Sequence, residues 1–195
     1  MASSTEAKTL IEVLANGAGG HPALVSPDGP SLTYDSLRTQ VARLMGQLKS
    51  FGIHKEDRVA IVLPNGLEVI ASFLAVTGVA TAAPLNAAYK PDEFEFYLDD
   101  TNAKAVITGP DVSQEAVDAA PKGAIHIVVT MDDAGVINFT GPSCATPSTD
   151  PDLGADDVAL VLHTSGTTSR PKRVPLTHKN LTTSLKNVAA TYSLN

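Results

Sequence analysis

The sequence predicts an α/β fold, in which helices cross over between the strands of a mostly parallel sheet. Helical patterns alternate along the chain with short apolar runs, and this alternation is typical of parallel pairing. The run RVAIVL at Arg58–Leu63 is apolar after its first residue and ends at the turn sequence PNG, as expected for a strand buried on both faces. The chain has 195 residues, of which 43% are hydrophobic, so it can bury an ample core.

The first half of the chain predicts three helices around two strands. Thr33 can cap a helix in which Leu37, Val41, Leu44 and Leu48 recur at helical spacing before the chain reaches Gly52. After the strand Arg58–Leu63, a largely apolar helix runs from Leu67 to Gly78, and ATAAPL at 80–85 is a short strand. Pro91, followed by two acidic residues, begins the third helix.

The second half predicts further strands and a polar connection. Apolar runs at 105–107 and 125–129 flank a weak helical pattern at 112–120. A strand at Val158–Leu162, a hydroxyl-rich loop, a strand near Val174 and a helix from about Lys179 follow. We therefore expect a first α/β subdomain at 1–139, a Pro-rich connection at 140–156, and the start of a second subdomain at 157–195. We also expect the domain to be truncated after this helix, which would leave an unpaired, aggregation-prone sheet edge.

Composition and charge exclude several classes of protein. The chain has 14 Lys and Arg against 21 Asp and Glu, a net charge of -7, which disfavours binding to nucleic acid or an anionic membrane surface. The single cysteine, Cys144, excludes an internal disulfide and fits a reducing compartment. The uncharged stretch Val69–Tyr89 fits a buried helix and strand better than a membrane span. The amino terminus lacks the pattern of a signal peptide, and we expect a cytoplasmic protein.

Positive charge is concentrated near the carboxyl-terminal end of the sequence. Residues 158–195 contain five basic residues and no acidic one. They include the segment HTSGTTSRPK at His163–Lys172, in which one glycine, five hydroxyl side chains and a lysine suit a polyphosphate. The segment is not a Walker A loop, because Pro171 and Arg173 occupy places where that motif has glycine and Ser or Thr. A solvated Ser/Thr-rich turn is the alternative interpretation.

Other chemically capable residues have plainer explanations. The spacing of His163 and His178 fits no common metal-ligand pattern, so a structural or hydrogen-bonding role is expected for both. Cys144 lies in the Pro-rich connection without a surrounding motif, and we expect it to be inert. No glycine triplet lies between a first strand and helix, which disfavours a dinucleotide-binding oxidoreductase.

The segment Thr164–Lys172 resembles the phosphate-binding signature of the adenylate-forming (AMP-binding) superfamily, which includes acyl-CoA synthetases, luciferases and adenylation domains. The continuation Val174–His178 is similar to the stretch that follows in that family, and Ser31–Leu37 and Asp57–Asn65 resemble two further family segments. Within the family, residues 80–98 and 163–181 are most similar to oxalate-CoA ligases, which are related to 4-coumarate-CoA ligase-like enzymes.

The resemblance implies an ATP-dependent acid-CoA ligase. In this reaction a carboxylate attacks the α-phosphate of ATP, pyrophosphate leaves, and the acyl group then passes to the thiol of CoA. Oxalate is the leading substrate, and another carboxylate such as 4-coumarate or a fatty acid is the alternative. A noncatalytic nucleotide-binding or protein-interaction fragment is the remaining alternative. The family also allows a peroxisomal location in place of the cytoplasm, and the sequence is silent on oligomeric state.

The resemblance also assigns residues. It assigns the whole of Thr164–Lys172 to cofactor binding, including Ser169, Arg170 and Pro171. Thr164, Ser165, Gly166, Thr167 and Thr168 would contact the β- and γ-phosphates, Lys172 would lie nearby as a positive charge, and Ser169 and Arg170 would form the loop. The ligand of Mg²⁺, the CoA site and the catalytic lysine are expected beyond residue 195, so the chain alone should not complete adenylation. Arg173 stands where the family usually has glycine, and a left-handed backbone there would strain it by about 1 to 2 kcal/mol.

Overall fold

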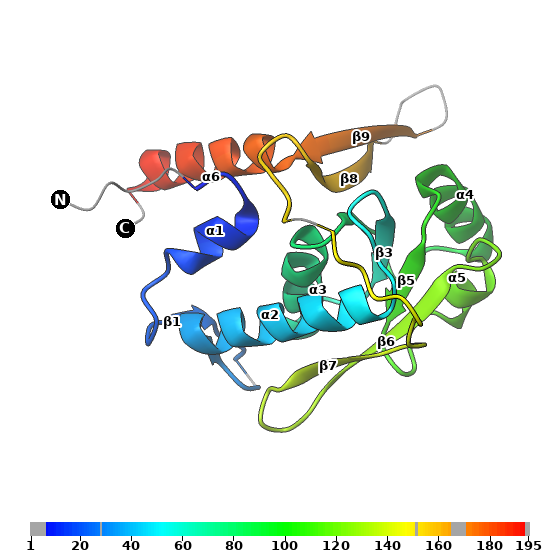
Figure 1. Ribbon diagram of the computed structural model, residues 1–195, viewed down its shortest axis with the longest axis horizontal. Coiled ribbons are helices and arrows are strands. Elements are labelled where there is room, and N and C mark those ends of the chain that lie inside the picture. The colour runs from blue at the N-terminus through cyan, green and yellow to red at the C-terminus, as the bar shows by residue number, and fades with distance from the viewer. Residues whose placement is uncertain (1–6, 28, 151, 165–170, 194–195) are drawn as a thin grey trace.

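The computed structural model describes residues 7–27, 29–150, 152–164 and 171–193, and it has a seven-stranded sheet with helices on both faces (Figure 1). The strand order is β7-β6-β5-β3-β4-β8-β9. Pairing is parallel from β6 through β8, and the two outer strands, β7 and β9, pair antiparallel with their neighbours. The predicted α/β fold with a mostly parallel sheet is therefore confirmed.

The bounds of the elements agree closely with the sequence patterns in most places. The strands are β1 (Pro22–Leu24), β2 (Leu32–Thr33), β3 (Arg58–Val62), β4 (Thr81–Pro84), β5 (Ala105–Thr108), β6 (Ile125–Met131), β7 (Ile137–Thr140), β8 (Val158–Thr164) and β9 (Lys172–Thr177). The helices are α1 (Leu10–Ala15), α2 (Tyr34–Ser50), α3 (Leu67–Thr77), α4 (Pro91–Thr101), α5 (Gln114–Asp118) and α6 (His178–Tyr192). The weak pattern at 112–120 forms only the short helix α5.

The uncharged stretch Val69–Tyr89 forms most of α3 and all of β4, as predicted. In the part of the chain that the structure describes, we find no helix with the length and apolar character needed to cross a bilayer.

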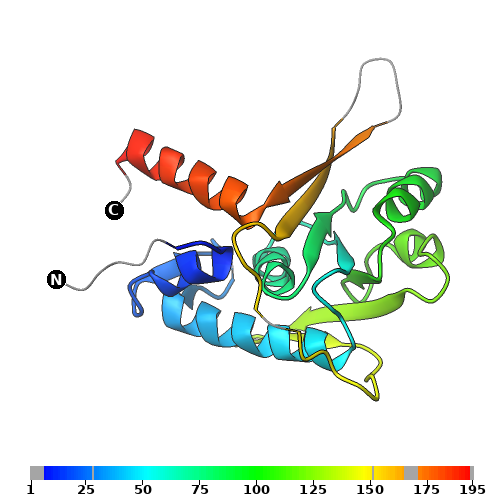
Figure 2. The same cartoon turned by 45° about the horizontal axis from the view of Figure 1, so that its top comes forward.

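The core lies on both faces of the sheet, and β3 shows how one strand serves both. Val59 and Ile61 belong to the apolar cluster that includes residues of α2 and α3. Ala60 and Val62 belong to a second cluster, which contains Phe94 of α4. Because successive side chains of a strand point to opposite faces, an apolar run is required wherever both faces are covered. The helices in Figure 2 accordingly lie on either side of the central strands.

The strand β7 and its contacts with α2 are not predicted by the sequence patterns. The Gln40 side chain donates from Nε2 to the Gly135 carbonyl at 2.9 Å and accepts from the Ile137 N–H at 2.7 Å. Gln47 accepts from the Phe139 N–H at 3.1 Å. Side chains of α2 therefore pair with several outer backbone groups of this edge strand, which would otherwise be exposed for pairing.

At the opposite side of the sheet, β8 and β9 form a hairpin that projects from the body (Figure 2). The strand β8 lies parallel to β4, and the Thr81 hydroxyl donates to the Val158 carbonyl at 2.9 Å. The strands β8 and β9 therefore belong to the same sheet as β3, β4 and β5. The division of the chain at 140–156 stays a prediction.

Candidate phosphate-binding site

The predicted phosphate-binding segment follows the carboxyl end of β8. In open α/β sheets, ligands bind outside the carboxyl ends of the parallel strands, so this position is suitable for a nucleotide. Thr164 is the last residue of β8 and Lys172 is the first residue of β9. The predicted contacts Ser165, Gly166, Thr167, Thr168, Ser169 and Arg170 lie outside the described residues, and their roles stay predictions.

The structure brings the two ends of the segment together. Thr164 and Lys172 are direct partners in the antiparallel ladder, and the Thr164 hydroxyl donates to the Lys172 carbonyl at 3.4 Å. Pro171 is half-buried beside Lys172. A hydroxyl donor and an ammonium therefore lie on adjacent strand ends, where both can reach one polyanion.

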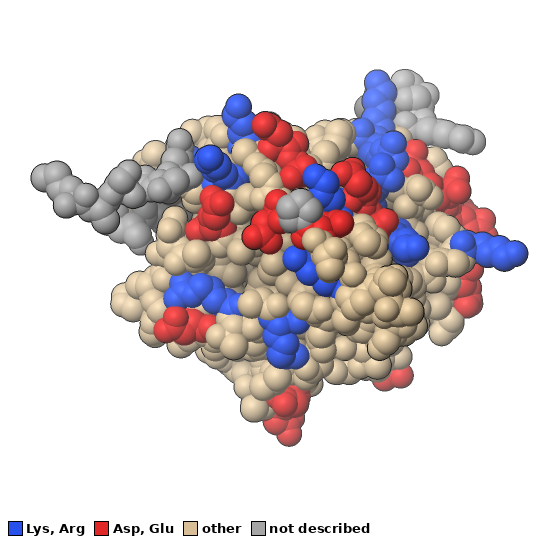
Figure 3. Space-filling model, viewed as in Figure 1, with Lys and Arg blue, Asp and Glu red and all other residues tan. Residues whose placement is uncertain are grey.

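The charges at this end of the sheet suit an anionic ligand. Thr164 and Lys172 are exposed, and the Lys172 ammonium forms no ion pair with any residue in the described ranges. Basic side chains gather beside the projecting hairpin in Figure 3, with acidic side chains on the neighbouring surface. Within the described ranges, no ion pair would have to break for Lys172 to bind a ligand.

His163 has a structural role, as predicted. Its side chain is 6% exposed, and its Nε2 lies 2.9 Å from Oδ2 of Asp100 at the end of α4. The imidazole also packs edge-on against Tyr97, with ring centroids 4.8 Å apart. Sequence reasoning missed Asp100 and Tyr97, because 63 residues separate Asp100 from His163 and no local pattern links them.

Arg173 does not adopt the left-handed backbone that would strain an arginine. Arg173 lies in β9 opposite His163, in extended backbone that any residue adopts. The non-glycine residues with left-handed backbone in the described ranges are Asn102, Ser113 and Ser193. The guanidinium of Arg173 donates to the Asp100 carbonyl, so the side chain has a partner that glycine could not provide.

His178, the second histidine that flanks the segment, is fully buried and is also structural. Its Nδ1 accepts a hydrogen bond from the Leu10 N–H at 3.3 Å, and its Nε2 has no hydrogen-bond partner among the described residues. Burial lowers the pKa of the imidazole, and the Thr77 backbone, Asp157 and Glu12 oppose that shift.

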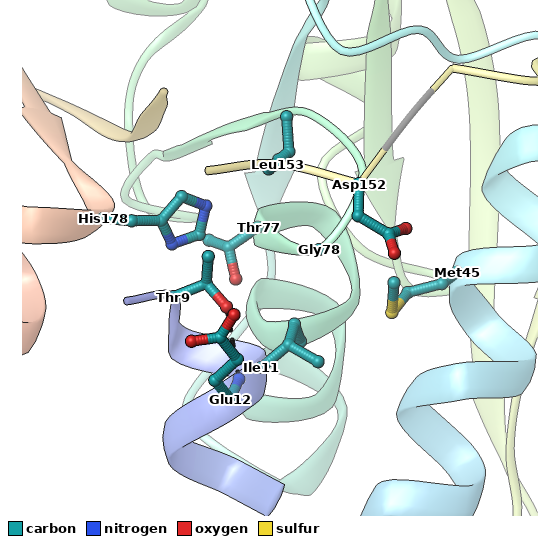
Figure 4. A pocket seen from close by; sticks show the side chains of 9 residues that line it. All are labelled: Thr9, Ile11, Glu12, Met45, Thr77, Gly78, Asp152, Leu153 and His178. Carbon is teal, nitrogen blue, oxygen red and sulfur yellow. Dashed lines mark hydrogen bonds between the residues drawn. The ribbon is translucent and has the colours of Figure 1, made fainter. Parts of the chain in front are cut away.

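The imidazole of His178 borders a pocket of about 170 Å³ between α1, α3 and the 152–153 segment (Figure 4). Glu12 and Asp152 also line this pocket. Nevertheless, no group of three ligating side chains suitable for a metal ion exists within the described ranges.

Comparisons with known proteins agree with this geometry. The family model for the AMP-binding enzyme matches residues 11–195. An oxalate-CoA ligase of Arabidopsis thaliana is 43% identical over 97% of this chain and 39% of its own length. An oxalate-CoA ligase of Saccharomyces cerevisiae is 37% identical over 73% of this chain and 31% of its own length. The chain therefore spans about two-fifths or less of these relatives.

A solved structure extends the comparison to three dimensions. The crystal structure of ATP-bound MatB from Rhodopseudomonas palustris is similar, with a TM-score of 0.76 and 26% sequence identity. The match covers 94% of this chain and 37% of the MatB chain. The chain thus belongs to the AMP-binding enzyme family, and it corresponds to the amino-terminal part of the family's CoA ligases.

Proposed function

We propose that this chain supplies the ATP phosphate-binding part of an acid-CoA ligase, which activates a carboxylate as its adenylate before transfer to CoA. The observation that carries the proposal is the pairing of Thr164 with Lys172 at the carboxyl end of β8. The two residues bound a segment rich in hydroxyls, within a stretch from 158 to 195 that has no acidic residue. The family membership supports the same reaction class.

The proposed chemistry concerns the leaving group of the first step. Negative charge increases on pyrophosphate as the carboxylate attacks the α-phosphate, and fixed donors aimed at that charge lower the barrier. The Thr164 hydroxyl and the Lys172 ammonium would bind the phosphate oxygens, together with Ser165, Gly166, Thr167 and Thr168. Loss of one such donor typically costs about 2.7 to 4 kcal/mol of activation free energy. Mg²⁺ and CoA are proposed to bind mainly through residues outside this chain.

The substitution Lys172→Ala tests the phosphate-binding role in the complete protein that carries this chain. We expect the rate of carboxylate-dependent exchange between pyrophosphate and ATP to fall by about tenfold or more, because a charge-assisted contact to the leaving group is lost. The rate is measured with labelled pyrophosphate at saturating carboxylate.

A matched control is Lys179→Ala, which also removes one exposed lysine. Lys179 lies in α6, which follows the end of β9 that is farther from Thr164. This variant should keep an exchange rate close to that of the parent protein. Equal rates in Lys172→Ala and the parent would refute the proposed role of the segment.

The proposed carboxylate is oxalate. Two relatives named oxalate-CoA ligase, from a plant and a yeast, support this choice, although substrate selection depends on the whole enzyme. The test compares kcat/KM for oxalate, 4-coumarate and a fatty acid in the complete protein. A higher kcat/KM for 4-coumarate or the fatty acid would refute oxalate as the substrate, but it would not refute the proposal that the protein is an acid-CoA ligase. We further propose a cytoplasmic location, with the peroxisome as the alternative.

A noncatalytic interaction role is the second candidate, and one observation favours it. Leu185, Val188 and Tyr192 of α6 are 45%, 44% and 72% exposed, which gives this helix an apolar face open to a partner. Calorimetry with ATP separates the two functions. Saturable binding that weakens in Lys172→Ala supports the phosphate site, whereas no binding together with capture of a defined protein partner supports the second candidate.

A further inference from the structure

One residue of α4 holds both strands of the projecting hairpin. The Asp100 carboxylate contacts Nε2 of His163 on β8 at 2.9 Å, and the Asp100 carbonyl accepts a hydrogen bond from Arg173 on β9. His163 and Arg173 are direct ladder partners, one position away from the pair Thr164 and Lys172. We infer that Asp100 is a positioning residue, which fixes these two strand ends for polyphosphate binding; this inference rests on the proposed function.

The contact with His163 is rigid because the imidazole is enclosed. The His163 side chain is 6% exposed and meets Tyr97 edge-on at an interplanar angle of 63°. Tyr97 in turn stacks on Tyr89, with ring centroids 4.8 Å apart and an interplanar angle of 17°. A buried ring in such surroundings has few alternative rotamers, so its hydrogen bond to Asp100 defines where β8 ends relative to α4.

The contact with Arg173 uses the negative end of a helix. The last carbonyls of α4 carry partial negative charge, which favours cationic side chains at this position. Arg58 donates to the Thr101 carbonyl at 3.1 Å, and Arg173 donates to the preceding carbonyl, that of Asp100. Two arginines from different strands therefore bind the end of the same helix, and the outermost strand β9 gains an anchor besides its ladder with β8.

Because Asp100 is negatively charged, a positioning role and a purely electrostatic role predict opposite changes in ATP binding when its carboxylate is removed. Asp100 adds negative charge next to a site proposed for a polyanion, so electrostatics alone predicts tighter ATP binding when the carboxylate is removed. A positioning role predicts the opposite, because loss of the hydrogen bond to His163 would displace Thr164 and Lys172. A misplacement of about 1 Å can cost about a hundredfold in rate.

The experiment measures KM for ATP in pyrophosphate exchange by the complete protein. We expect Asp100→Ala to raise this KM by about tenfold or more, and Asp100→Asn, which keeps an acceptor for His163, to stay within about twofold of the parent. The matched control Asp99→Ala removes the same charge from an exposed neighbour on α4 and should not raise KM. Reversible partial unfolding also raises the apparent KM, so urea denaturation must first show that each variant is fully folded under the assay conditions before its KM reports positioning.

An unchanged KM in Asp100→Ala, or an equal rise in Asp99→Ala, would overturn the inference. If Asp100→Ala fails to fold, His163→Phe, which removes the hydrogen bond to Asp100, decides the matter with the exposed His21→Phe as its control, since each replaces one imidazole by a ring without hydrogen-bonding groups and removes no lysine or arginine. Equal KM values in that pair would likewise overturn the inference. The proposed function fails separately, when Lys172→Ala leaves the exchange rate unchanged.

Discussion

His178 shows how a single buried side chain links distant parts of this chain. It is the first residue of α6, and its Nδ1 accepts a hydrogen bond from the backbone of Leu10, the first residue of α1. An imidazole can accept at Nδ1 only while that nitrogen is unprotonated, so the contact requires the neutral ring. The interaction between α1 and α6 should therefore depend on pH.

The pKa of His178 predicts the direction of that dependence. Burial lowers the folded pKa below the ordinary value of 6.5, so the unfolded chain takes up a proton first as the pH falls. The contribution of His178 to stability is then complete above pH 6.5 and is lost progressively below it. We expect the free energy of unfolding to fall by up to about 1.4 kcal/mol per pH unit in this range.

Urea denaturation at several pH values between 7.5 and 5 would measure this effect. In His178→Gln, the fall in unfolding free energy with pH should be shallower than in the parent. The control is His21→Gln, which removes an exposed histidine and should retain the parent slope. Identical slopes in the parent and His178→Gln would show that the buried imidazole does not control this pH dependence.

At the scale of elements, α2 depends on the hydroxyl that begins it. The Thr33 Oγ1 accepts a hydrogen bond from the Ser36 N–H at 3.2 Å, and satisfies a backbone donor that no helical carbonyl can reach. We expect Thr33→Ala to lower the unfolding free energy by about 1 kcal/mol. Denaturant titration gives the value. Thr39→Ala makes the same chemical change inside α2 at an exposed position and should cost less.

The elements that the sequence predicts well are those with local signals. Caps and helical periodicity define α2 and α4, and the continuous apolar run defines β3. The strand β7 has only four residues, and its outer backbone groups pair with the side chains of α2 almost a hundred residues earlier. Its stability comes from tertiary contacts, which no local pattern contains.

The candidate site likewise contains residues that a local sequence motif selects and residues that only the tertiary fold brings close. The sequence pattern selects Thr164 and Lys172, and the structure shows the two residues side by side; their contact with phosphate stays a prediction. Asp100 was not predicted as their neighbour, since the meeting of α4 with β8 depends on the order of strands in the sheet. A sequence motif can select candidate ligand-binding groups such as these, whereas residues that would orient them, such as Asp100, can come from any part of the fold.

At the scale of the whole molecule, the sheet has an outer strand, β9, that could pair with another chain. The strand carries Lys172, Arg173 and Pro175, and charged residues and proline are typical of edges protected against aggregation. We expect Pro175→Val to aggregate faster during incubation at 37 °C, because valine restores an N–H donor and favours strand pairing. Light scattering would follow this, and Pro110→Val, an exposed turn position, is the control.

The contacts of Gln40 and Gln47 with β7 make the two flanks of the molecule unequal. On the β7 flank, a helix takes the place that a neighbouring strand would occupy, and no hydrogen-bonding groups of Ile137 remain for a newcomer. A further strand should therefore join this sheet more readily at the β9 flank, beside the hairpin that carries Thr164 and Lys172.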